Sequence, residues 1–520
     1  MSDFTNNLPK NLYRTTQVRE LDRIAIEDIG IAGFDLMKIA ATSVFKNLIK
    51  KWPQTRRLLV FAGAGNNGGD GYIVSVLAKE AGLGVDLIQI AESTQLKGAA
   101  ELAFNLAKSK NIAMHLYCES SRVKETDHAH TVVVDALLGT GITRPVSGDY
   151  KLAIEKINAM DCPVIAIDIP SGLNGDSGRQ MGLAVEADIT VSFIGMKQGL
   201  LTAEGRDHAG EIVFDDLGLP EHIYKEKAAP IVEVIRIDIN DVPRMIAPRR
   251  ESSHKGNHGH VVVIGGDYCF GGAALMAAEA AQRSGAGLVS LITRTQHRPA
   301  ILSRRPELMV LGTEDSEQDI GTLLGKASTI VVGPGLGGNE WSKKLLQKAL
   351  SAQQAHGIPL IIDADGLRLL SDRAISEKAI KRSNWILTPH PGEAASLLNC
   401  SVDEIQSDRF TAIRKLSKIW GGVCLLKGSG SLIHQDAANG EIYLCTEGNS
   451  GMASGGMGDV LCGIVGSLVG QGLDLKDALC CAVCIHGEAA DLALENGGKR
   501  GLLATDIYPY VRQLVNHPLS

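Results

Sequence analysis

Short apolar runs rich in Val, Ile and Leu recur along this 520-residue chain, and many of them end at a Gly or an Asp. Examples are Leu58–Ala62, Thr131–Asp135, Val164–Asp168, Val261–Gly265 and Thr329–Gly333. Because these runs do not alternate strictly between apolar and polar residues, they predict strands that are buried on both faces of a parallel sheet. Helical stretches such as Tyr72–Glu80 and Gly271–Ser284 lie between them. Alternation of strand and helix predicts βαβ units and an α/β fold.

The runs fall into two sets, separated by a stretch from about residue 220 to about residue 258. This stretch carries four prolines and a charged segment, but it also contains the apolar run Ile231–Ile239, so it is not a disordered linker. The length is too great for one typical domain and suits two large ones. We therefore expect two α/β domains that meet near residues 225–240.

Composition excludes several classes of protein. The net charge is −7 and no long run of Lys or Arg occurs, so a nucleic-acid-binding surface is not expected. We expect no membrane attachment, because no apolar stretch is long enough to span a bilayer and the first residues do not resemble a signal peptide. The ten Cys lack the spacing of a disulfide scaffold, which predicts reduced thiols in a cytoplasmic protein.

A glycine-rich turn follows the first strand. Gly63, Gly65 and Gly68 form a GxGxxG pattern between a predicted strand and a predicted helix, the context of a dinucleotide-binding turn. The backbone amides of such a turn can bind phosphate oxygens. Asn66 and Asp70 are among the polar residues inserted into it, and they could be either turn formers or ligand contacts.

Two further strand ends carry polar side chains. Asp135 ends one buried strand, and Asp168 ends the next, with Ser171 shortly after it. Carboxyl ends of parallel strands line the ligand crevice of an open sheet. Asn67, Asp135 and Ser171 would supply only oxygen ligands, which suit a hard cation, and Asp168 could act as an acid or base. The alternative for each residue is helix capping.

The second half contains a glycine-rich turn that opens an apolar helix, with Asp459 at the start of that helix. Backbone amides there can bind a phosphate, and the Asp459 carboxylate could take a proton from a hydroxyl that attacks a phosphoryl group. Its alternative role is an N-cap. Lys427, followed by Gly428 and Gly430, could hold nucleotide phosphates or could be a solvated lysine.

Taken together, the two sites resemble the family of bifunctional NAD(P)H-hydrate repair enzymes. The segments that carry the resemblance are residues 66–71, 134–141 and 168–172 in the first half and 333–337, 388–393, 427–430 and 455–459 in the second. The resemblance covers about residues 15–515. It implies a Rossmann-like three-layer sandwich with epimerase activity over residues 1–228, and a ribokinase-like α/β domain with dehydratase activity over residues 229–520.

The resemblance also implies roles for individual residues. The dinucleotide site of the epimerase would comprise Asn66, Asn67, Gly68, Gly69, Asp70, Gly139, Thr140, Gly141, Ile142, Thr143, Arg144, Pro145 and Asp168. Its potassium site would comprise Asn67, Asp135 and Ser171. The hydrate site of the dehydratase would comprise Ala273, Gly335 or Gly337, His390 and Asp459. The nucleotide site would comprise Lys427, Gly428, Ser429, Gly430, Ser431 and Gly458.

On this interpretation, the first domain interconverts the R and S epimers of hydrated NADH or NADPH, with Asp168 as a catalytic candidate. The second phosphorylates the hydroxyl of the S epimer with ADP, aided by Asp459 and Mg²⁺, and then releases phosphate to restore NAD(P)H, with AMP as the other product. K⁺ would serve the epimerase. We expect a homo-oligomer.

Three alternatives stay open at this point. The second domain could be an ordinary small-molecule kinase of ribokinase-like type, since the same turn and Asp459 would serve it. The first could belong to an NAD-dependent dehydrogenase, which calls for an acidic residue at the end of the second strand. That strand ends in Gln89-Ile90-Ala91-Glu92, which fits this requirement ambiguously. The chain could also be a nucleotide-binding scaffold without catalytic activity.

Overall fold

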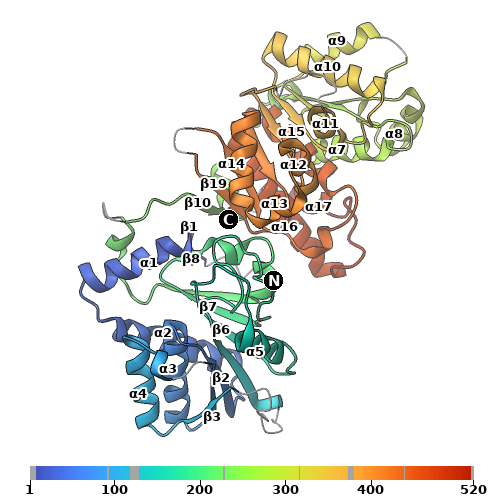
Figure 1. Cartoon of the computed structure of the whole chain (residues 1–520). Helices are drawn as coiled ribbons and strands as arrows, with labels where there is room; N and C mark the ends of the chain where they lie inside the picture. The colour runs from blue at the N-terminus through green and yellow to red at the C-terminus, as the bar shows by residue number, and fades with distance from the viewer. Residues whose placement is uncertain are drawn as a thin grey trace. The chain divides into compact units, whose positions relative to one another are not determined.

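A computed structural model describes residues 8–90, 93–117, 128–225, 229–314, 317–372, 380–437 and 440–516 (Figure 1). The chain forms two compact units, one running up to Val234 and the other starting at Ile235. Both contain a sheet covered by helices, which confirms the predicted α/β organisation in two domains. The predicted boundary between residues 228 and 229 touches residues outside the described ranges and stays a prediction.

The N-terminal unit is built on a parallel sheet. Its strand order is β4-β3-β2-β5-β6-β7-β9, and each neighbouring pair in this order is parallel. The strands are β2 (Arg57–Ala62), β3 (Gly84–Gln89), β4 (Ala113–Leu116), β5 (Thr131–Ala136), β6 (Val164–Ile167), β7 (Ile189–Phe193) and β9 (Glu211–Asp215). The order reverses direction between β2 and β5, and such a reversal places a ligand crevice at the carboxyl ends of these two strands.

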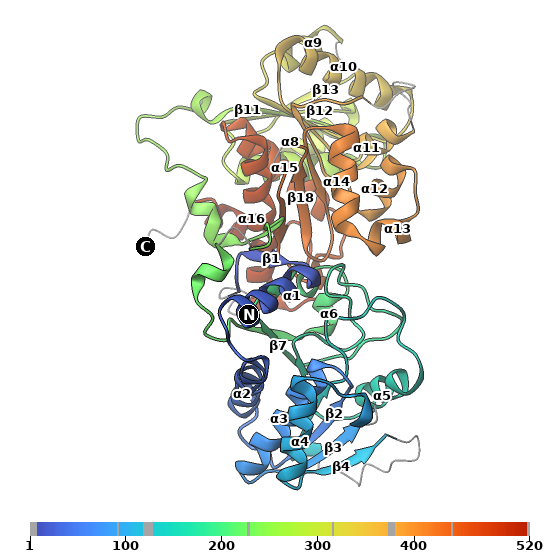
Figure 2. The same ribbon diagram turned by 60° about the vertical axis from the view of Figure 1, so that its left-hand side comes forward.

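Helices cover both faces of this sheet. They are α1 (Thr15–Arg23), α2 (Gly33–Lys51), α3 (Asn66–Glu80), α4 (Ala99–Ser109), α5 (Gly148–Asn158) and α6 (Gly205–His208). Successive β2 residues point to opposite faces: Leu58 and Val60 pack with α2, α3 and α4, whereas Leu59 packs with α5. Figure 2 shows α5 on one side of the sheet and α3 and α4 on the other. The unit is thus the expected three-layer sandwich.

The helical region before the first sheet strand is divided into separate elements. Helix α1 ends at Arg23, a π-helical turn follows over Ile24–Asp28, and α2 begins only at Gly33. Gly30 lies between them with a φ of 84°, a left-handed conformation that ends a helix and that favours glycine. Before α1, the short strand β1 (Asn11–Tyr13) pairs with β8 (Met196–Lys197).

The C-terminal unit has a larger mixed sheet. Its strand order is β13-β12-β11-β14-β15-β16-β17-β18-β19-β10, parallel from β13 to β17 and antiparallel at β18 and β19. The strands are β10 (Val234–Ile237), β11 (His260–Ile264), β12 (Leu288–Thr293), β13 (Met309–Gly312), β14 (Thr329–Val332), β15 (Leu360–Ile362), β16 (Trp385–Leu387), β17 (Val423–Leu426), β18 (Ser431–Gln435) and β19 (Ile442–Cys445). As predicted, the central strands are buried along their whole length.

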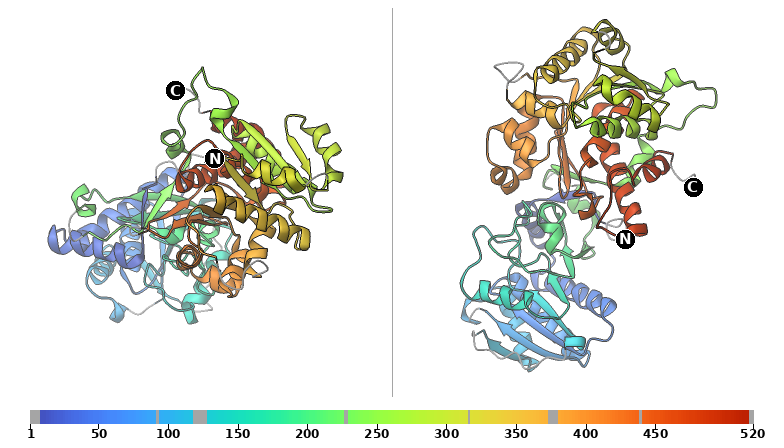
Figure 3. Two further views of the ribbon diagram at one scale, coloured as in Figure 1. Left: turned by 90° about the horizontal axis from the view of Figure 1, so that it is seen from above. Right: turned by 90° about the vertical axis from the view of Figure 1, so that its right-hand side faces the viewer.

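Helices again lie on both faces of the sheet, as the two views of Figure 3 show. They are α7 (Gly271–Arg283), α8 (Arg298–Arg304), α9 (Glu317–Leu324), α10 (Glu340–His356), α11 (Ala364–Ser371), α12 (Pro391–Leu398), α13 (Val402–Ser407), α14 (Arg409–Trp420), α15 (Met457–Gly470), α16 (Leu475–Gly497) and α17 (Tyr508–Leu514). The helices α7 and α15 pack backbone to backbone, since a Cβ on Gly463 would lie 2.1 Å from the carbonyl oxygen of Ala277. No helix among the described residues has the length and apolar character to cross a membrane.

The CxxC pair on α16 is part of the core. Cys481 and Cys484 are buried among apolar side chains, and their neighbours include Met245 and Cys445. Burial raises the pKa of the Cys481 thiol to about 12, so this thiol stays protonated at neutral pH. These two cysteines are therefore core residues of the C-terminal unit.

Candidate functional site

A cavity of about 990 Å³ opens at the carboxyl ends of β2 and β5 in the N-terminal unit. Predicted site residues that line it are Asn66, Asn67, Asp70, Gly139, Thr140, Gly141, Ile142, Thr143, Arg144, Pro145 and Asp168. Gly68 and Gly69 are not in this lining, because they face the interior: a Cβ on Gly68 would lie 2.0 Å from the carbonyl oxygen of Gly63, and one on Gly69 would lie 2.5 Å from Met37. The structure therefore brings most of the predicted dinucleotide site together around one cavity.

The glycine pattern allows the two loops of the crevice to touch. A Cβ on Gly63 would lie 1.9 Å from the carbonyl oxygen of Leu137 in the loop after β5, whereas a Cβ on Gly65 would meet no atom within 4 Å. The polar residues Asn66 and Asn67 belong to the first turn of α3, so the helix starts six residues before the predicted Tyr72. Their side chains are placed by a helix and not by a flexible turn.

An acidic cluster with one lysine lies at the wall of this cavity. Asp168 has a φ of 67° and forms an ion pair with Lys197, whose side chain is only 1% exposed. The Lys197 ammonium also donates hydrogen bonds to the carbonyl oxygen of Phe193 (3.0 Å) and to the hydroxyl of Ser192 (3.2 Å). A buried lysine with a carboxylate partner at a cavity wall is a candidate for proton transfer.

Two more carboxylates belong to the cluster. Burial raises the pKa of Asp22 to about 6, with the charge of Lys197 lowering it and that of Asp168 raising it. Burial and the charges of Asp168 and Asp22 raise the pKa of Asp70 well above its usual range. Sequence reasoning assigns no role to Asp22 or Lys197. The sequence offers only a weak indication of a role for Lys197, namely the position of a charged residue in an apolar segment.

The three predicted metal ligands lie deeper in the same unit. Asp135 is fully buried, and one carboxylate oxygen accepts a hydrogen bond from the Ser171 hydroxyl (2.6 Å) while the other accepts one from the Ser171 amide (2.7 Å). Burial raises the pKa of Asp135 to about 6 despite these bonds. The amide oxygen and nitrogen of Asn67 are buried without a hydrogen-bond partner among the described residues. A buried carboxylate and an unpartnered amide oxygen are a donor set that suits a monovalent or divalent hard cation.

The end of the second strand in this unit bears on the dehydrogenase alternative. Gln89 is the last residue of β3, and its side chain is buried and donates a hydrogen bond to the hydroxyl of Tyr72 (2.9 Å). Gln89 does not provide the exposed carboxylate that would hold a ribose in a typical dinucleotide-binding sheet, and Glu92, the acidic residue near this strand end, lies outside the described residues.

The C-terminal unit gathers a second set of charged residues around the start of α15. Asp459 is the third residue of this helix, and Gly456, with a φ of 93°, is its N-cap, so Asp459 is not the cap. The Lys427 ammonium forms an ion pair with Asp363 (2.7 Å) and lies 3.9 Å from Glu393. A Cβ on Gly458 would lie 3.3 Å from the Lys427 ammonium nitrogen. Lys427 is therefore part of a charged cluster and not a solvated lysine.

Burial raises the pKa of two acids in this cluster. Burial and the charges of Asp363, Asp365 and Glu393 together raise the pKa of Asp459 to about 7, while the charge of Lys427 lowers it. Burial also raises the pKa of Glu393. Four carboxyl groups thus share one lysine, an excess of negative charge that favours binding of a cation. Sequence reasoning assigns no role to Asp363, Asp365 or Glu393, although all three lie in motifs that end strands.

His390 caps the helix next to this cluster. Its Nδ1 accepts hydrogen bonds from the amides of Gly392 (3.0 Å) and Glu393 (3.3 Å), and its Nε2 lies 3.5 Å from the Glu393 carboxylate. Burial and the charge of Lys427 lower the pKa of His390. Its side chain is 57% exposed, which leaves it accessible to a ligand.

A buried arginine supports the loop after β17. Gly428 and Gly430 have φ values of 138° and 65°, and the Ser431 hydroxyl donates to the carbonyl oxygen of Gly428 (3.2 Å). The Arg409 guanidinium is buried beneath the loop and donates to the carbonyl oxygens of Leu426, Lys427 and Gly430, each at 3.3 Å. These hydrogen bonds to backbone carbonyl oxygens fix the conformation of the loop from residue 427 to residue 431.

The predicted hydrate residues Ala273, Gly335 and Gly337 come from two neighbouring loops. A Cβ on Gly335 would lie 3.1 Å from the Cβ of Ala273, so these residues are in contact. The Gly337 amide donates a hydrogen bond to Asp365 (2.8 Å), whose charge also raises the pKa of Asp459. Ala273, both glycines and Asp459 therefore border the same end of the sheet. Among the described residues, no group of three or more His, Cys, Asp or Glu side chains is arranged to hold a metal ion without further ligands.

Two family profiles match the chain, one for each unit. Residues 33–199 match the YjeF-related protein N-terminus, and residues 261–513 match NAD(P)H-hydrate dehydratase. Among solved structures, a ribokinase-like superfamily protein from Enterococcus faecalis V583 is 29% identical with a TM-score of 0.49, over 54% of this chain and 95% of that chain.

Relatives match along the whole length. The bifunctional NAD(P)H-hydrate repair enzyme Nnr of Coxiella burnetii is 44% identical over 505 residues, 97% of this chain and 99% of the relative. The enzyme of the same name from Escherichia coli K12 is 40% identical over 98% of this chain and 95% of its own length. The chain therefore belongs to the family of bifunctional NAD(P)H-hydrate repair enzymes.

Proposed function

We propose that this protein repairs hydrated NADH and NADPH in two steps. The N-terminal unit interconverts the R and S epimers of the hydrate, and the C-terminal unit dehydrates the S epimer with ADP, which yields NAD(P)H, AMP and phosphate. The observation that carries the proposal is the presence, in one chain with full-length relatives of this family, of two separate clusters that each combine carboxylates with an ion-paired lysine.

In the dehydratase step, Asp459 takes the proton of the hydrate hydroxyl. The hydroxyl oxygen then attacks the β-phosphorus of ADP, a new O–P bond forms, and the bond to the leaving AMP breaks. Phosphate is a better leaving group than hydroxide, so its departure, with loss of a proton from the adjacent ring carbon, restores the double bond. A pKa of about 7 suits Asp459 to this task, since a general base works best when its pKa lies near the operating pH.

The nucleotide binds beside this base. Lys427 and the loop through Gly428, Ser429, Gly430 and Ser431 hold ADP. Because a Cβ on Gly458 would lie 3.3 Å from the Lys427 ammonium nitrogen, the lack of a side chain there lets the phosphates approach the start of α15. Hydrate is held by Ala273, Gly335 or Gly337, and His390. Mg²⁺ is commonly bound by one or two carboxylates together with substrate phosphates, and the excess of carboxylates around Lys427 suits it. Asp363, beside Lys427, would hold the ion, which would neutralise charge on the transferring phosphoryl group.

In the epimerase step, Asp168 contacts the hydrate within the cavity, and the neighbouring Lys197 and Asp22 hold and exchange protons there. K⁺ would be held by Asn67, Asp135 and Ser171, and the unpartnered Asn67 amide and the buried Asp135 carboxylate both fit a cation. The ion would fix the start of α3 against the loops after β5 and β6. We further propose that the protein acts in the cytoplasm as a homo-oligomer.

A single assay tests the dehydratase proposal. Hydrated NADH is incubated with the protein and either ADP or ATP, while the absorbance of reduced nicotinamide and the phosphorylated products are followed. We expect the absorbance to return with stoichiometric release of AMP from ADP. Accumulation of a phosphorylated compound without return of the absorbance would instead identify a small-molecule kinase.

A further inference from the structure

Two aromatic side chains are exposed in the loop that joins β11 to α7. Tyr268 is 53% exposed and Phe270 is 56% exposed, and the other large apolar side chains exposed among the described residues are aliphatic or Met. Exposure of an aromatic ring to water is unfavourable, so two such rings on one loop indicate a ligand-binding surface.

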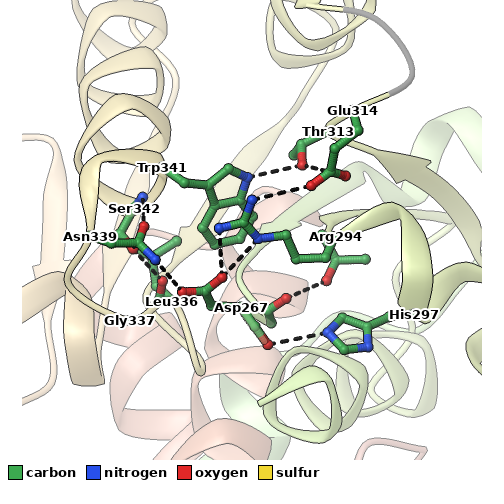
Figure 4. Close-up of polar contacts among 12 residues, drawn as sticks. Asp267, Arg294, His297, Thr313, Glu314, Leu336, Gly337, Asn339, Trp341 and Ser342 are labelled. Carbon is green, nitrogen blue, oxygen red and sulfur yellow. Dashed lines mark hydrogen bonds and ion pairs between the residues drawn. The ribbon is translucent and has the colours of Figure 1, made fainter. Parts of the chain in front are cut away.

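The Tyr268 ring packs against the guanidinium group of Arg294. The Arg294 guanidinium carbon lies 4.4 Å from the centre of the Tyr268 ring and 4.0 Å from that of Trp341. Arg294 is fixed in turn by Asp267 (2.8 Å) and Glu314 (3.2 Å), as Figure 4 shows. Because both of these partners are carboxylates, the charge of Arg294 is neutralised and the guanidinium serves as a flat support and not as an anion site.

The same loop borders the residues proposed to bind the hydrate. The Asp267 amide donates to the carbonyl oxygen of Gly335 (2.7 Å), and a Cβ on Gly335 would lie 2.7 Å from the Cβ of Phe270. A Cβ on Gly337 would lie 2.8 Å from the Asp267 carboxylate, which also accepts a hydrogen bond from Asn339 (2.7 Å). Tyr268 therefore lies next to the glycine turn, in the loop that leads into α7 and Ala273, and the reacting end of the substrate lies beside Asp459.

We propose that the Tyr268 ring, supported by Arg294, stacks against the adenine of the hydrated dinucleotide during dehydration. This inference rests on the proposed function. The substrate has two bases joined by a pyrophosphate, so when its hydrated ring is at Asp459, its adenine must lie at a distance along the edge of the sheet. The first turn of α7, Gly271-Gly272-Ala273, follows Tyr268 closely in the chain and contacts the glycine turn through Ala273. The Ala273 amide donates to the carbonyl oxygen of Phe270 (3.1 Å), and the amides of Gly271 and Gly272 at the helix start suit the pyrophosphate.

A comparison of two substrates tests the proposal. The S hydrate of NADH carries the adenine, and the S hydrate of reduced nicotinamide mononucleotide has the same reacting ring without it. For Tyr268→Ala in the full chain we expect a KM for hydrated NADH raised about tenfold, the usual effect of losing one base–aromatic stack. The KM for the mononucleotide hydrate and the KM for ADP should stay unchanged. Tyr268→Phe, which keeps the ring, should retain the original KM.

Controls separate this effect from damage to the fold. Ile419→Ala removes an exposed apolar side chain from α14 in the same unit and should change none of these constants. An equal rise in KM for both hydrates, or a rise in the KM for ADP alone, would overturn the proposal, and so would an unchanged KM for hydrated NADH. If the unaltered protein restored neither hydrate, the proposed function itself would be wrong, and this inference would fall with it.

Discussion

The two units differ in how deeply the lysine of each charged cluster is buried and in its ion pairs. In the N-terminal unit, Lys197 is 1% exposed and forms its ion pair with Asp168 at a cavity wall that Asp22 and Asp70 also line. In the C-terminal unit, Lys427 is 19% exposed, pairs with Asp363 and lies 3.9 Å from Glu393. The first arrangement can move a proton within an enclosed site. The second leaves negative charge that a cation and a nucleotide can neutralise, and it leaves Asp459 as a base near neutral pH.

The largest effect is expected from a substitution that disrupts only the charged cluster around Asp459 in the C-terminal unit. Asp459→Asn should lower the dehydratase rate by about a thousandfold, the range expected when a general base is removed, and should leave epimerisation unchanged. Dehydration is measured with the pure S hydrate and ADP, and epimerisation with the R hydrate. Because the amide is the same size as the acid, ADP binding should be retained. A proportional loss of both activities would show that the two clusters do not act separately.

The converse substitution disrupts only the charged cluster around Lys197 in the N-terminal unit. Lys197→Met should lower the epimerase rate by about a hundredfold or more, since it removes the cationic partner of Asp168 and a proton donor. The dehydratase rate with the S hydrate should stay unchanged. Lys51→Met, on the surface of the same unit, serves as the control. Unfolding should be followed by circular dichroism, because loss of a buried ion-pair partner also destabilises the unit. Retention of epimerase activity in a folded Lys197→Met variant would rule out this role of the lysine.

Substitutions at two glycines of one motif should have different effects on the stability of the N-terminal unit. Gly63→Ala places a Cβ 1.9 Å from the carbonyl oxygen of Leu137 and should destabilise the N-terminal unit by about 1–3 kcal/mol or more. Gly65→Ala meets no atom within 4 Å and should leave the stability unchanged, while raising the epimerase KM if the dinucleotide approaches Gly65 closely. Urea unfolding curves measure the first effect. Equal stability of the two variants would contradict the close contact of the crevice loops.

The smallest effect is a shift in pH dependence. The kcat/KM of the dehydratase should rise as the pH passes through about 7, because Asp459 must lose its proton to act as a base. Since the negative charge of Glu393 raises the pKa of Asp459, Glu393→Gln should move the midpoint of this rise to lower pH. The epimerase profile of the same variant should stay where it was. A shift to higher pH would contradict the proposed electrostatics of the cluster.

Much of this structure could be predicted because buried parallel strands and glycine turns leave local signals. Strand ends identified Asp135 and Ser171, and a glycine-rich turn before a helix identified Asp459; the structure brings Asp135 and Ser171 into hydrogen-bond contact. Asp22 and Lys197 were missed because they enter the site from α1 and from a two-residue strand, far from any strand-end motif. Their role depends on tertiary packing, which no local pattern encodes. The start of α3 was also missed, since Asn66 and Asn67 are as typical of turns as of a helical first turn.

The central claim, that two separate sites act in sequence on one substrate, is tested most directly with an equal mixture of R and S hydrated NADH and an excess of ADP. The account predicts that the unaltered chain restores the full absorbance of reduced nicotinamide. Lys197→Met should restore rapidly only the half contributed by the S epimer, and Asp459→Asn should restore none. Full and rapid recovery by the Lys197→Met chain, or recovery of only half by the unaltered chain, would contradict it.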